Sequence, residues 1–307
     1  MCIRDRRGVR AVELALADPE RAAEFYAKIW NLEIVEQFKD SYWLRGTGRY
    51  HHILSLHPSR GRPSIRRVIY DAESEELVDQ LFARVSSADV VCESPHKLDW
   101  PGGGYGFGFR DPTGRAHAVV AGVADHADDR KVKDRPYKIA HINFNDKEGV
   151  RLREFFQNAL GFRFVDHAGM QYFLNANSPD HCSVVICESA FNTLNHLSFE
   201  MSDLDSVMRS AGRMKDGGYP IEWGVGRHGA AENVFAYFCG PEEMPIEYTA
   251  DVLQIDENYP FSGPEHWKWP PNRKDQWGVT EPHSPRWKRI QSLFGFDSAY
   301  TLPNAKP

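Results

Sequence analysis

The stretch FYAKIWNLEIV, at Phe25–Val35, recurs later in the chain as FFQNALGFRFV, at Phe155–Val165. Two more pairs of segments match in the same order at an offset of about 129 residues: Asp71–Val85 with Glu200–Met214, and Phe109–Pro112 with Phe238–Pro241. Three ordered matches at nearly one offset indicate that the chain contains two copies of one domain. A period this long predicts a duplicated domain and not a solenoid.

Each copy alternates short apolar segments with amphipathic ones. An apolar strand at Val9–Ala15 precedes Pro19–Trp30, where apolar residues recur at the spacing of one helix face. Short strands follow, and the same order begins again near Arg67. The second copy repeats the pattern from Ile139 and again from about Asn195. The sequence therefore predicts an α+β fold of four βαβββ modules, paired into two similar domains.

Composition divides the chain into four parts. The two copies cover residues 8–122 and 138–252, and the charged segment 123–137 links them. Residues 253–307 have no counterpart in the first copy and carry four tryptophans among prolines. We expect this tail to wrap over one domain, because exposed aromatic side chains are unfavourable. Met1–Arg7 fits none of the predicted elements, and we leave it out of the predicted fold.

The overall composition argues against several classes of protein. The 307 residues include 43 acidic and 37 basic ones, a net charge of −6, whereas a general nucleic-acid binder is usually basic. No apolar run reaches the length of about 18 residues that a membrane span needs, and no apolar signal segment follows the start. The five cysteines form no CxxC pair, which fits a reducing cytoplasm better than a disulfide scaffold.

Two histidines and a glutamate lie on separate predicted strands of the second copy. They are His141 in KIAHINFN, His196 in LNHLSFEM and Glu247 in MPIEYTAD. Two neutral imidazoles and one carboxylate can bind a divalent metal and leave about three coordination positions open, as in non-haem Fe(II) oxygenases. The same donor set also suits a hydrolytic zinc site.

Three further polar residues accompany this set. His181 precedes His196 by 15 residues, His228 lies in GVGRHG, and Tyr237 lies in VFAYFCGP. Beside a metal, imidazoles and a phenol can move protons and stabilise an anionic oxygen. His52 of the first copy aligns with His181, but no ligands accompany it, and we interpret it as structural.

The segment GRHGAAENVFAYFCGPEEMPIEYTAD, at Gly226–Asp251, resembles the signature of type I extradiol ring-cleavage dioxygenases of the vicinal oxygen chelate superfamily. The resemblance covers about Val9–Val252 and is to the two-domain branch of 2,3-dihydroxybiphenyl 1,2-dioxygenases and catechol 2,3-dioxygenases. Three spacings are similar to those of this branch: 15 residues from His181 to His196, 9 from His228 to Tyr237, and 10 from Tyr237 to Glu247. The sequence departs from the family's pattern at Gly240 and at Gly229–Ala231.

The resemblance implies a role for each of these positions. The ligands of Fe(II), or of Mn(II) in its place, would be His141, His196 and Glu247. His181 would be the acid–base residue beside bound oxygen, and His228 and Tyr237 would hydrogen-bond the substrate oxygens. The implied reaction inserts O2 into a small aromatic vicinal diol and opens the ring next to the diol, in aromatic catabolism. The resemblance also implies a homo-oligomer, and the composition predicts a cytoplasmic protein with no nucleic-acid or membrane partner.

Two other functions on the same scaffold stay open. One is a metal-dependent isomerase or lyase, as in glyoxalases, which often have a glutamate where this chain has His141. The other is a non-catalytic module that binds an aromatic ligand, like the members that sequester bleomycin. Those members lack the metal triad that this chain retains. Metal content would test the binding module, and oxygen consumption would test the isomerase.

Overall fold

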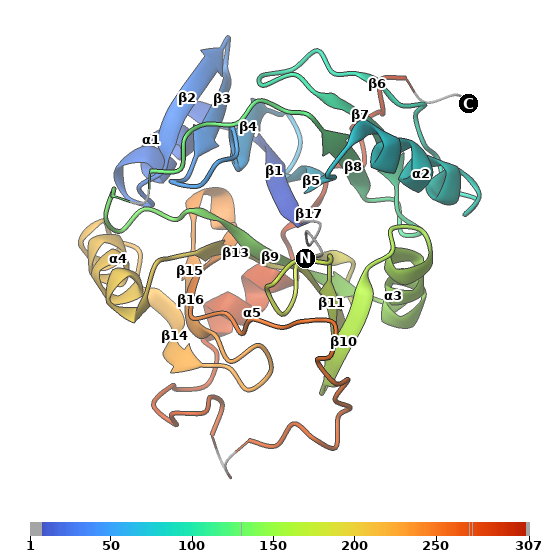
Figure 1. Ribbon diagram of the computed structural model, residues 1–307. Coiled ribbons are helices and arrows are strands. Elements are labelled where there is room, and N and C mark those ends of the chain that lie inside the picture. The colour runs from blue at the N-terminus through green and yellow to red at the C-terminus, as the bar shows by residue number, and fades with distance from the viewer. Residues whose placement is uncertain (1–7, 130, 270, 272, 305–307) are drawn as a thin grey trace.

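The first half of the chain folds into one mixed sheet with two helices (Figure 1). The structure is a computed structural model that describes residues 8–129, 131–269, 271 and 273–304. The strands of the first half are β1 (Val9–Leu16), β2 (Glu33–Phe38), β3 (Ser41–Arg45), β4 (Leu54–Pro58), β5 (Ser64–Asp71), β6 (His96–Lys97), β7 (Tyr105–Arg110) and β8 (Ala116–Ala121). The helices are α1 (Pro19–Lys28) and α2 (Glu75–Ser86). The strand order across the sheet is β2-β3-β4-β1-β5-β8-β7-β6.

The second half repeats this arrangement. Its strands are β9 (Lys138–Asp146), β10 (Arg163–Ala168), β11 (Gln171–Asn175), β12 (Val184–Glu188), β13 (Thr193–Glu200), β14 (Ile221–Arg227), β15 (Val234–Cys239) and β16 (Pro245–Ala250). Its helices are α3 (Gly149–Asn158), α4 (Leu204–Asp216) and a short 3-10 turn, Pro241–Glu243. The order β10-β11-β12-β9-β13-β16-β15-β14 is that of the first sheet with each strand replaced by its counterpart. The predicted duplication and its four βαβββ modules are confirmed.

The helices are short and amphipathic, and α1 shows why they form where they do. The side chain of Asp18 accepts a hydrogen bond from the backbone N–H of Arg21 at 3.0 Å and caps the helix. Pro19 fits the first turn, where its missing N–H costs nothing. Phe25 and Tyr26 on the inner face are buried. Within the described ranges, no helix is both long enough and apolar enough to cross a bilayer.

The two halves share one hydrophobic core. Trp30, at the end of the first helical module, stacks on Tyr248 of β16 with ring centroids 3.6 Å apart and planes at 9°. The Tyr248 hydroxyl also donates to the carbonyl oxygen of Trp30 at 3.1 Å. Such an aromatic pair adds about 1 kcal/mol beyond the burial of its area. The strand that carries Glu247 is therefore held in place in part by packing against the first half.

The tail after β16 contacts both halves, whereas we expected it to cover one. Its helix α5 (Pro285–Gln291) packs against β13, β14, β15 and β16. Its strand β17 (Gly295–Phe296) then pairs in parallel with Ser64 and Ile65 of β5. Strand β8 pairs with β5 only from Val68 onward, so the backbone at Ser64 and Ile65 is open on that side. Strand β17 fills this gap, because buried backbone groups need hydrogen-bond partners.

Candidate metal and substrate site

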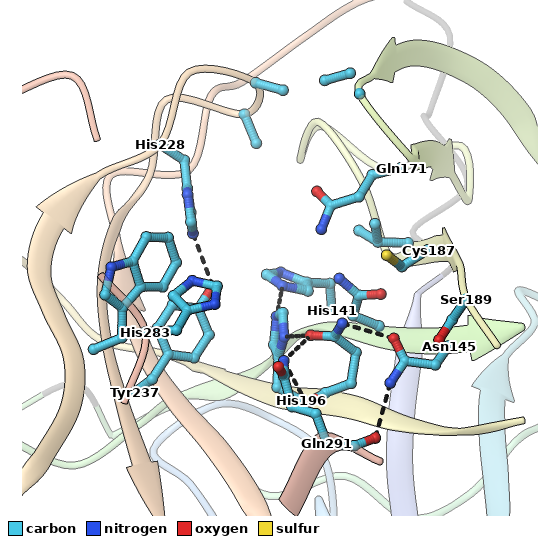
Figure 2. A pocket seen from close by; sticks show the side chains of 18 of the residues that line it. His141, Asn145, Gln171, Cys187, Ser189, His196, His228, Tyr237, His283 and Gln291 are labelled. Atoms are coloured by element: carbon cyan, nitrogen blue, oxygen red, sulfur yellow. Dashed lines mark hydrogen bonds between the residues drawn. The ribbon is translucent and has the colours of Figure 1, made fainter. Parts of the chain in front are cut away.

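A cavity of about 560 Å³ lies among residues of the second half and the tail (Figure 2). Its walls combine aromatic, amide and imidazole side chains. The large aromatic residues in the lining are Phe173, Phe191, Trp223, Tyr237, Trp269 and Trp287. A concave site of this size, mostly apolar with a few polar groups, is suited to a small aromatic molecule.

Three neighbouring strands bring the predicted metal ligands to one side of this cavity. Strands β9, β13 and β16 are adjacent, and Ser198 of β13 pairs with His141 on one side and with Glu247 on the other. His196 lies two residues before Ser198 on the same strand, so it points to the same face of the sheet. Residues far apart in the sequence are thus brought together by strand register alone.

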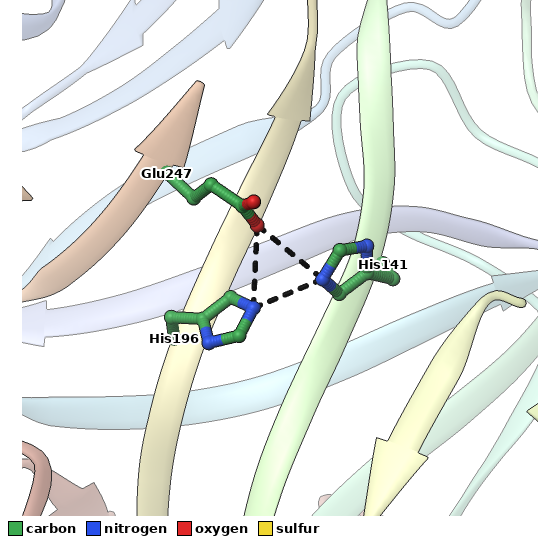
Figure 3. Close-up of side chains that lie close together, drawn as sticks. All are labelled: His141, His196 and Glu247. Carbon is green, nitrogen blue, oxygen red and sulfur yellow. Dashed lines mark hydrogen bonds and ion pairs between the residues drawn. The ribbon is translucent and has the colours of Figure 1, made fainter. Parts of the chain in front are cut away.

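The donor atoms of the three residues are close to one another (Figure 3). His141 Nε2 lies 2.9 Å from His196 Nε2. The Oε2 atom of Glu247 lies 3.4 Å from His141 Nε2 and 3.2 Å from His196 Nε2. Among the residues that the structure describes, this is the one group of three such side chains with all donor atoms within 4.8 Å.

The protonation states and the burial of these residues fit a divalent metal. Burial lowers the pKa of His141 to about 4 and that of His196 to about 3, so both rings are neutral near pH 7 and offer a lone pair. Both carboxylate oxygens of Glu247 are buried, and neither has a hydrogen-bond partner of normal geometry among the described residues. Burial raises the pKa of this carboxyl group, and the nearby His141 and His228 partly offset the increase. A divalent cation would satisfy the carboxylate and both imidazoles at once.

An amide network fixes the orientation of His196. Its Nδ1 donates a hydrogen bond to Oδ1 of Asn195 at 2.8 Å. The same oxygen accepts from Nε2 of Gln291 at 2.6 Å, and Nδ2 of Asn195 donates to Asn145 Oδ1 at 2.8 Å (Figure 2). Because Nδ1 carries the proton, Nε2 keeps its lone pair directed at the other two ligands. This network could not be predicted from the sequence, since Gln291 belongs to the tail.

His228 and Tyr237 lie beside the predicted metal ligands. Nε2 of His228 is hydrogen-bonded to the Tyr237 hydroxyl at 2.8 Å and lies 4.0 Å from Oε1 of Glu247. Burial lowers the pKa of His228 to about 4. Burial and the Glu247 carboxylate raise the pKa of Tyr237 well above its ordinary value. Near pH 7 the site therefore contains a neutral imidazole and a protonated phenol.

The structure places His181 away from the cavity, contrary to our expectation. Its side chain is fully buried and is not part of the cavity lining. Its Nε2 is hydrogen-bonded to Oδ2 of Asp166, and the same oxygen accepts a hydrogen bond from the Tyr259 hydroxyl at 2.9 Å. The His181 ring packs edge-on against Phe173, with centroids 5.4 Å apart. The buried Asp166 carboxylate holds the imidazole because it needs a polar partner there.

The next residue, Cys182, lines the cavity in place of His181. The backbone pairing with β9 explains the difference: Ser183 occupies the position that Ile53 has in the first half. Cys182 therefore corresponds to His52, which the sequence analysis aligned with His181. A shift of one residue in extended chain turns a side chain to the opposite face. Burial raises the pKa of the Cys182 thiol well above its ordinary value, so the thiol is protonated.

The described part of the first half has no metal triad at the corresponding positions. Strand register equates the three ligands with Ala11, Arg67 and Ala118. Arg67 instead donates two hydrogen bonds to the buried carboxylate of Glu13, at 2.8 and 3.1 Å. The first half thus has an ion pair where the second half has the predicted metal ligands.

Comparison with known proteins places the chain in a family. Residues 8–116 match the model described as the Glyoxalase/Bleomycin resistance protein/Dioxygenase superfamily. The chain is 30% identical to the Mn(II)-bound glyoxalase from Novosphingobium aromaticivorans, with a TM-score of 0.87 over 96% of this chain and 97% of that one. The protein belongs to this superfamily.

Two relatives found by sequence comparison have names that state a particular activity. The chain is 23% identical over 295 residues to the manganese-dependent 2,3-dihydroxybiphenyl 1,2-dioxygenase of Geobacillus genomosp. 3, covering 82% of this chain and 93% of that protein. It is 29% identical over 122 residues to metapyrocatechase 2 of Cupriavidus necator, covering 39% of this chain and 38% of that protein. The second match therefore spans well under half of that relative.

Proposed function

We propose that this protein is a metal-dependent extradiol dioxygenase of aromatic catabolism, which inserts both atoms of O2 into a catecholic substrate. The observation that supports this most directly is the cluster of His141, His196 and Glu247, with donor atoms within 4.8 Å of one another beside an aromatic-lined cavity. The names of the relatives from Geobacillus genomosp. 3 and Cupriavidus necator point to the same class of reaction.

The proposed metal is Fe(II), with Mn(II) as the alternative. When bound, either ion supplies neighbouring positions for a vicinal diol and for O2 and favours loss of a proton from the diol. The names of the Geobacillus relative and of the Novosphingobium structure favour Mn(II). The donor set of two imidazoles and one carboxylate accepts both ions.

His228 and Tyr237 are proposed to act on the oxygens of the substrate. The protonated hydroxyl of Tyr237 can donate a hydrogen bond to an anionic oxygen, which stabilises developing charge. The neutral imidazole of His228 can accept a proton at Nε2 from the diol and return it later in the reaction. In the structure these two groups are hydrogen-bonded to each other at 2.8 Å, and oxygens of the substrate would replace this bond.

For His181 we propose a positioning role. An acid–base role would require its imidazole to leave Asp166, because Cys182 faces the cavity at this point. Asp166 also accepts hydrogen bonds from the Tyr259 hydroxyl and, at 3.0 Å, from the backbone N–H of Ser262. The pair thus fixes the first part of the tail against β10.

A second candidate function is a metal-dependent isomerase of the glyoxalase type. The observation that favours it is the 30% identity, over nearly the full length, to a structure named as a Mn(II)-bound glyoxalase. Cys182 at the position expected for the acid–base histidine also fits this reading, because an isomerase does not need a proton donor beside bound oxygen.

Oxygen uptake tests these two functions against each other. Protein loaded anaerobically with Fe(II) or Mn(II) is given catechol, methylcatechols and 2,3-dihydroxybiphenyl, with visible spectra recorded in parallel. One O2 consumed for each yellow ring-opened product would establish the dioxygenase. Absence of uptake from fully loaded protein, together with conversion of a hemithioacetal of glutathione and methylglyoxal, would establish the isomerase.

The proposed setting is a cytoplasmic homo-oligomer. This proposal rests on the resemblance of the chain to the two-domain dioxygenases. Light scattering on the metal-loaded protein measures the assembly state, and a mass equal to the 35.1 kDa chain would overturn the oligomer.

A further inference from the structure

Two lysines of the tail reach the cavity without an acidic partner. Lys274 and Lys288 both belong to its lining, and no ion pair to either ammonium group occurs within the described part of the chain. Arg286, on the same helix as Lys288, is by contrast paired with Glu222 at 2.8 Å. The arginine charge is neutralised by the protein, whereas the two lysine charges are available to a molecule inside the cavity.

The lining of this cavity contains no acidic residue among those that the structure describes. Acidic residues nevertheless outnumber basic ones by 43 to 37 in the whole chain. Glu247 lies behind the lining as part of the metal cluster, and the remaining polar lining residues are amides, hydroxyls, thiols and imidazoles. A cleft lined by one sign of charge attracts ligands of the opposite sign.

His283 lines the same cavity as the two lysines. Burial lowers the pKa of His283 to about 4, and the charges of Lys288 and Lys274 lower it further. His283 contacts Trp223 with ring centroids 4.2 Å apart, and Trp223 stacks on Tyr237 at 5.2 Å and 18°. His283 therefore contacts the indole ring that stacks on Tyr237, whose hydroxyl is proposed to contact the substrate.

We propose that Lys274, Lys288 and His283 form a subsite for a carboxylate carried on a side chain of the aromatic diol. Two ammonium groups and an imidazole N–H can together bind both oxygens of a carboxylate. The inference rests on the proposed function, because it assumes a diol beside His141, His196 and Glu247. It narrows the substrate class from catechols in general to catechols with an anionic side chain.

Matched substrates test the subsite. 3-(2,3-Dihydroxyphenyl)propanoate and 3,4-dihydroxyphenylacetate are each compared with their methyl esters, which keep the diol and the ring but lack the charge. The kcat/KM of each pair is measured with the wild-type protein, with Lys274→Gln, with Lys288→Gln and with the double variant. Lys268→Gln is the control, because Lys268 is exposed on the same tail and lies outside the cavity lining.

The expected result is a preference for at least one acid over its ester that depends on both lysines. Both lysines are exposed, so each single change should lower kcat/KM for the acid about threefold, and the double change about tenfold. Turnover of the esters and all activities of Lys268→Gln should stay at the wild-type level. Added salt should weaken the preference, since exposed charges are screened.

Binding measurements separate failure of this inference from failure of the proposed function. The dissociation constants of acid and ester are measured anaerobically with protein that holds Zn(II), which supports no redox chemistry. If diols are cleaved but acids have no advantage over esters, the subsite is wrong and the dioxygenase stands. If no diol is cleaved but acids bind more tightly in a lysine-dependent way, the subsite stands and ring cleavage is wrong.

Discussion

Oδ1 of Asn195 accepts a hydrogen bond from Nδ1 of His196 at 2.8 Å, and this bond determines which imidazole nitrogen is free to bind a metal. The Asn195 side chain is itself oriented from outside the repeated domains. Gln291 of the tail donates to the same oxygen at 2.6 Å. The residue next to a metal ligand therefore connects that ligand to a helix that the duplication does not contain.

Replacing Asn195 with alanine should weaken metal binding without unfolding the protein. The His196 ring would lose the acceptor that fixes its tautomer, and loss of such an outer partner typically costs about 10- to 100-fold in metal affinity. Competition titrations with Mn(II) and a chromogenic chelator measure the change. Gln291→Ala should shift the affinity in the same direction by a smaller factor.

Asn158→Ala is the matched control for this experiment, because Asn158 is exposed at the end of α3 and is not part of the cavity lining. An unchanged dissociation constant in Asn195→Ala would show that the amide network does not orient the ligand.

Replacing Glu247 with glutamine should have opposite effects on the metal-free and the metal-loaded protein. The buried carboxylate has no hydrogen-bond partner of normal geometry among the described residues, so a neutral amide there should leave the metal-free protein at least as stable as the wild type. With Mn(II) present, the wild type should gain stability by mass action, whereas the variant should not. Thermal unfolding with and without chelator measures both. A metal-free variant that is less stable by about 2 kcal/mol would contradict the argument.

Replacing His181 with alanine should act mainly on stability. The change leaves the buried Asp166 without its imidazole partner, which typically costs about 3 kcal/mol. The adjacent Cys182→Ala change removes a small cavity-lining side chain and should cost about 1 kcal/mol. Urea denaturation measures both values. A His181→Ala protein with wild-type stability and no turnover would restore the acid–base role that the resemblance implies.

The metal-free protein should become less stable as the pH falls below about 6.5. Burial lowers the pKa of His52 to about 3 and that of His57 to about 4, from an ordinary value of 6.5. Below pH 6.5 the unfolded chain therefore takes up protons that the folded protein does not, and the free energy of unfolding decreases. Each such histidine contributes a loss of up to roughly 1.4 kcal/mol per pH unit within this window.

Chemical denaturation at pH 7, 5.5 and 4.5 measures this dependence. His52→Gln should reduce the slope, because the variant lacks one of the groups that titrate only when unfolded. A slope identical to that of the wild type would show that burial of His52 does not control the acid sensitivity.

The modules and the cluster of His141, His196 and Glu247 could be predicted from the sequence because both depend on local pattern. Apolar periodicity marks each strand and helix, and the repeat doubles the signal. His141, His196 and Glu247 each lie on a strand that the pattern identifies, and their neighbours in the sheet follow from the repeated order. The cluster in the structure is the one that this reasoning predicts.

The surroundings of the ligands could not be predicted in the same way. The face of the sheet to which His181 points depends on the strand register just before β12. A shift of one residue there reverses it, and the offset between the two copies is not constant along the chain. Gln291, Lys274 and Lys288 belong to a tail without a second copy, so no internal comparison indicates where they lie. The path of the tail across both halves depends on the open backbone of β5, a feature of the assembled sheet and not of any local segment.

The tail, which includes strand β17, contributes differently to the two halves of the duplication. The same short tail supplies Gln291 to the amide network of one half and two backbone partners, Gly295 and Phe296, to β5 of the other. A disturbance at Ser64 or Ile65 would therefore be transmitted through four residues of chain to the nitrogen that orients His196. The half without the cluster should therefore influence the metal affinity of the half that contains it.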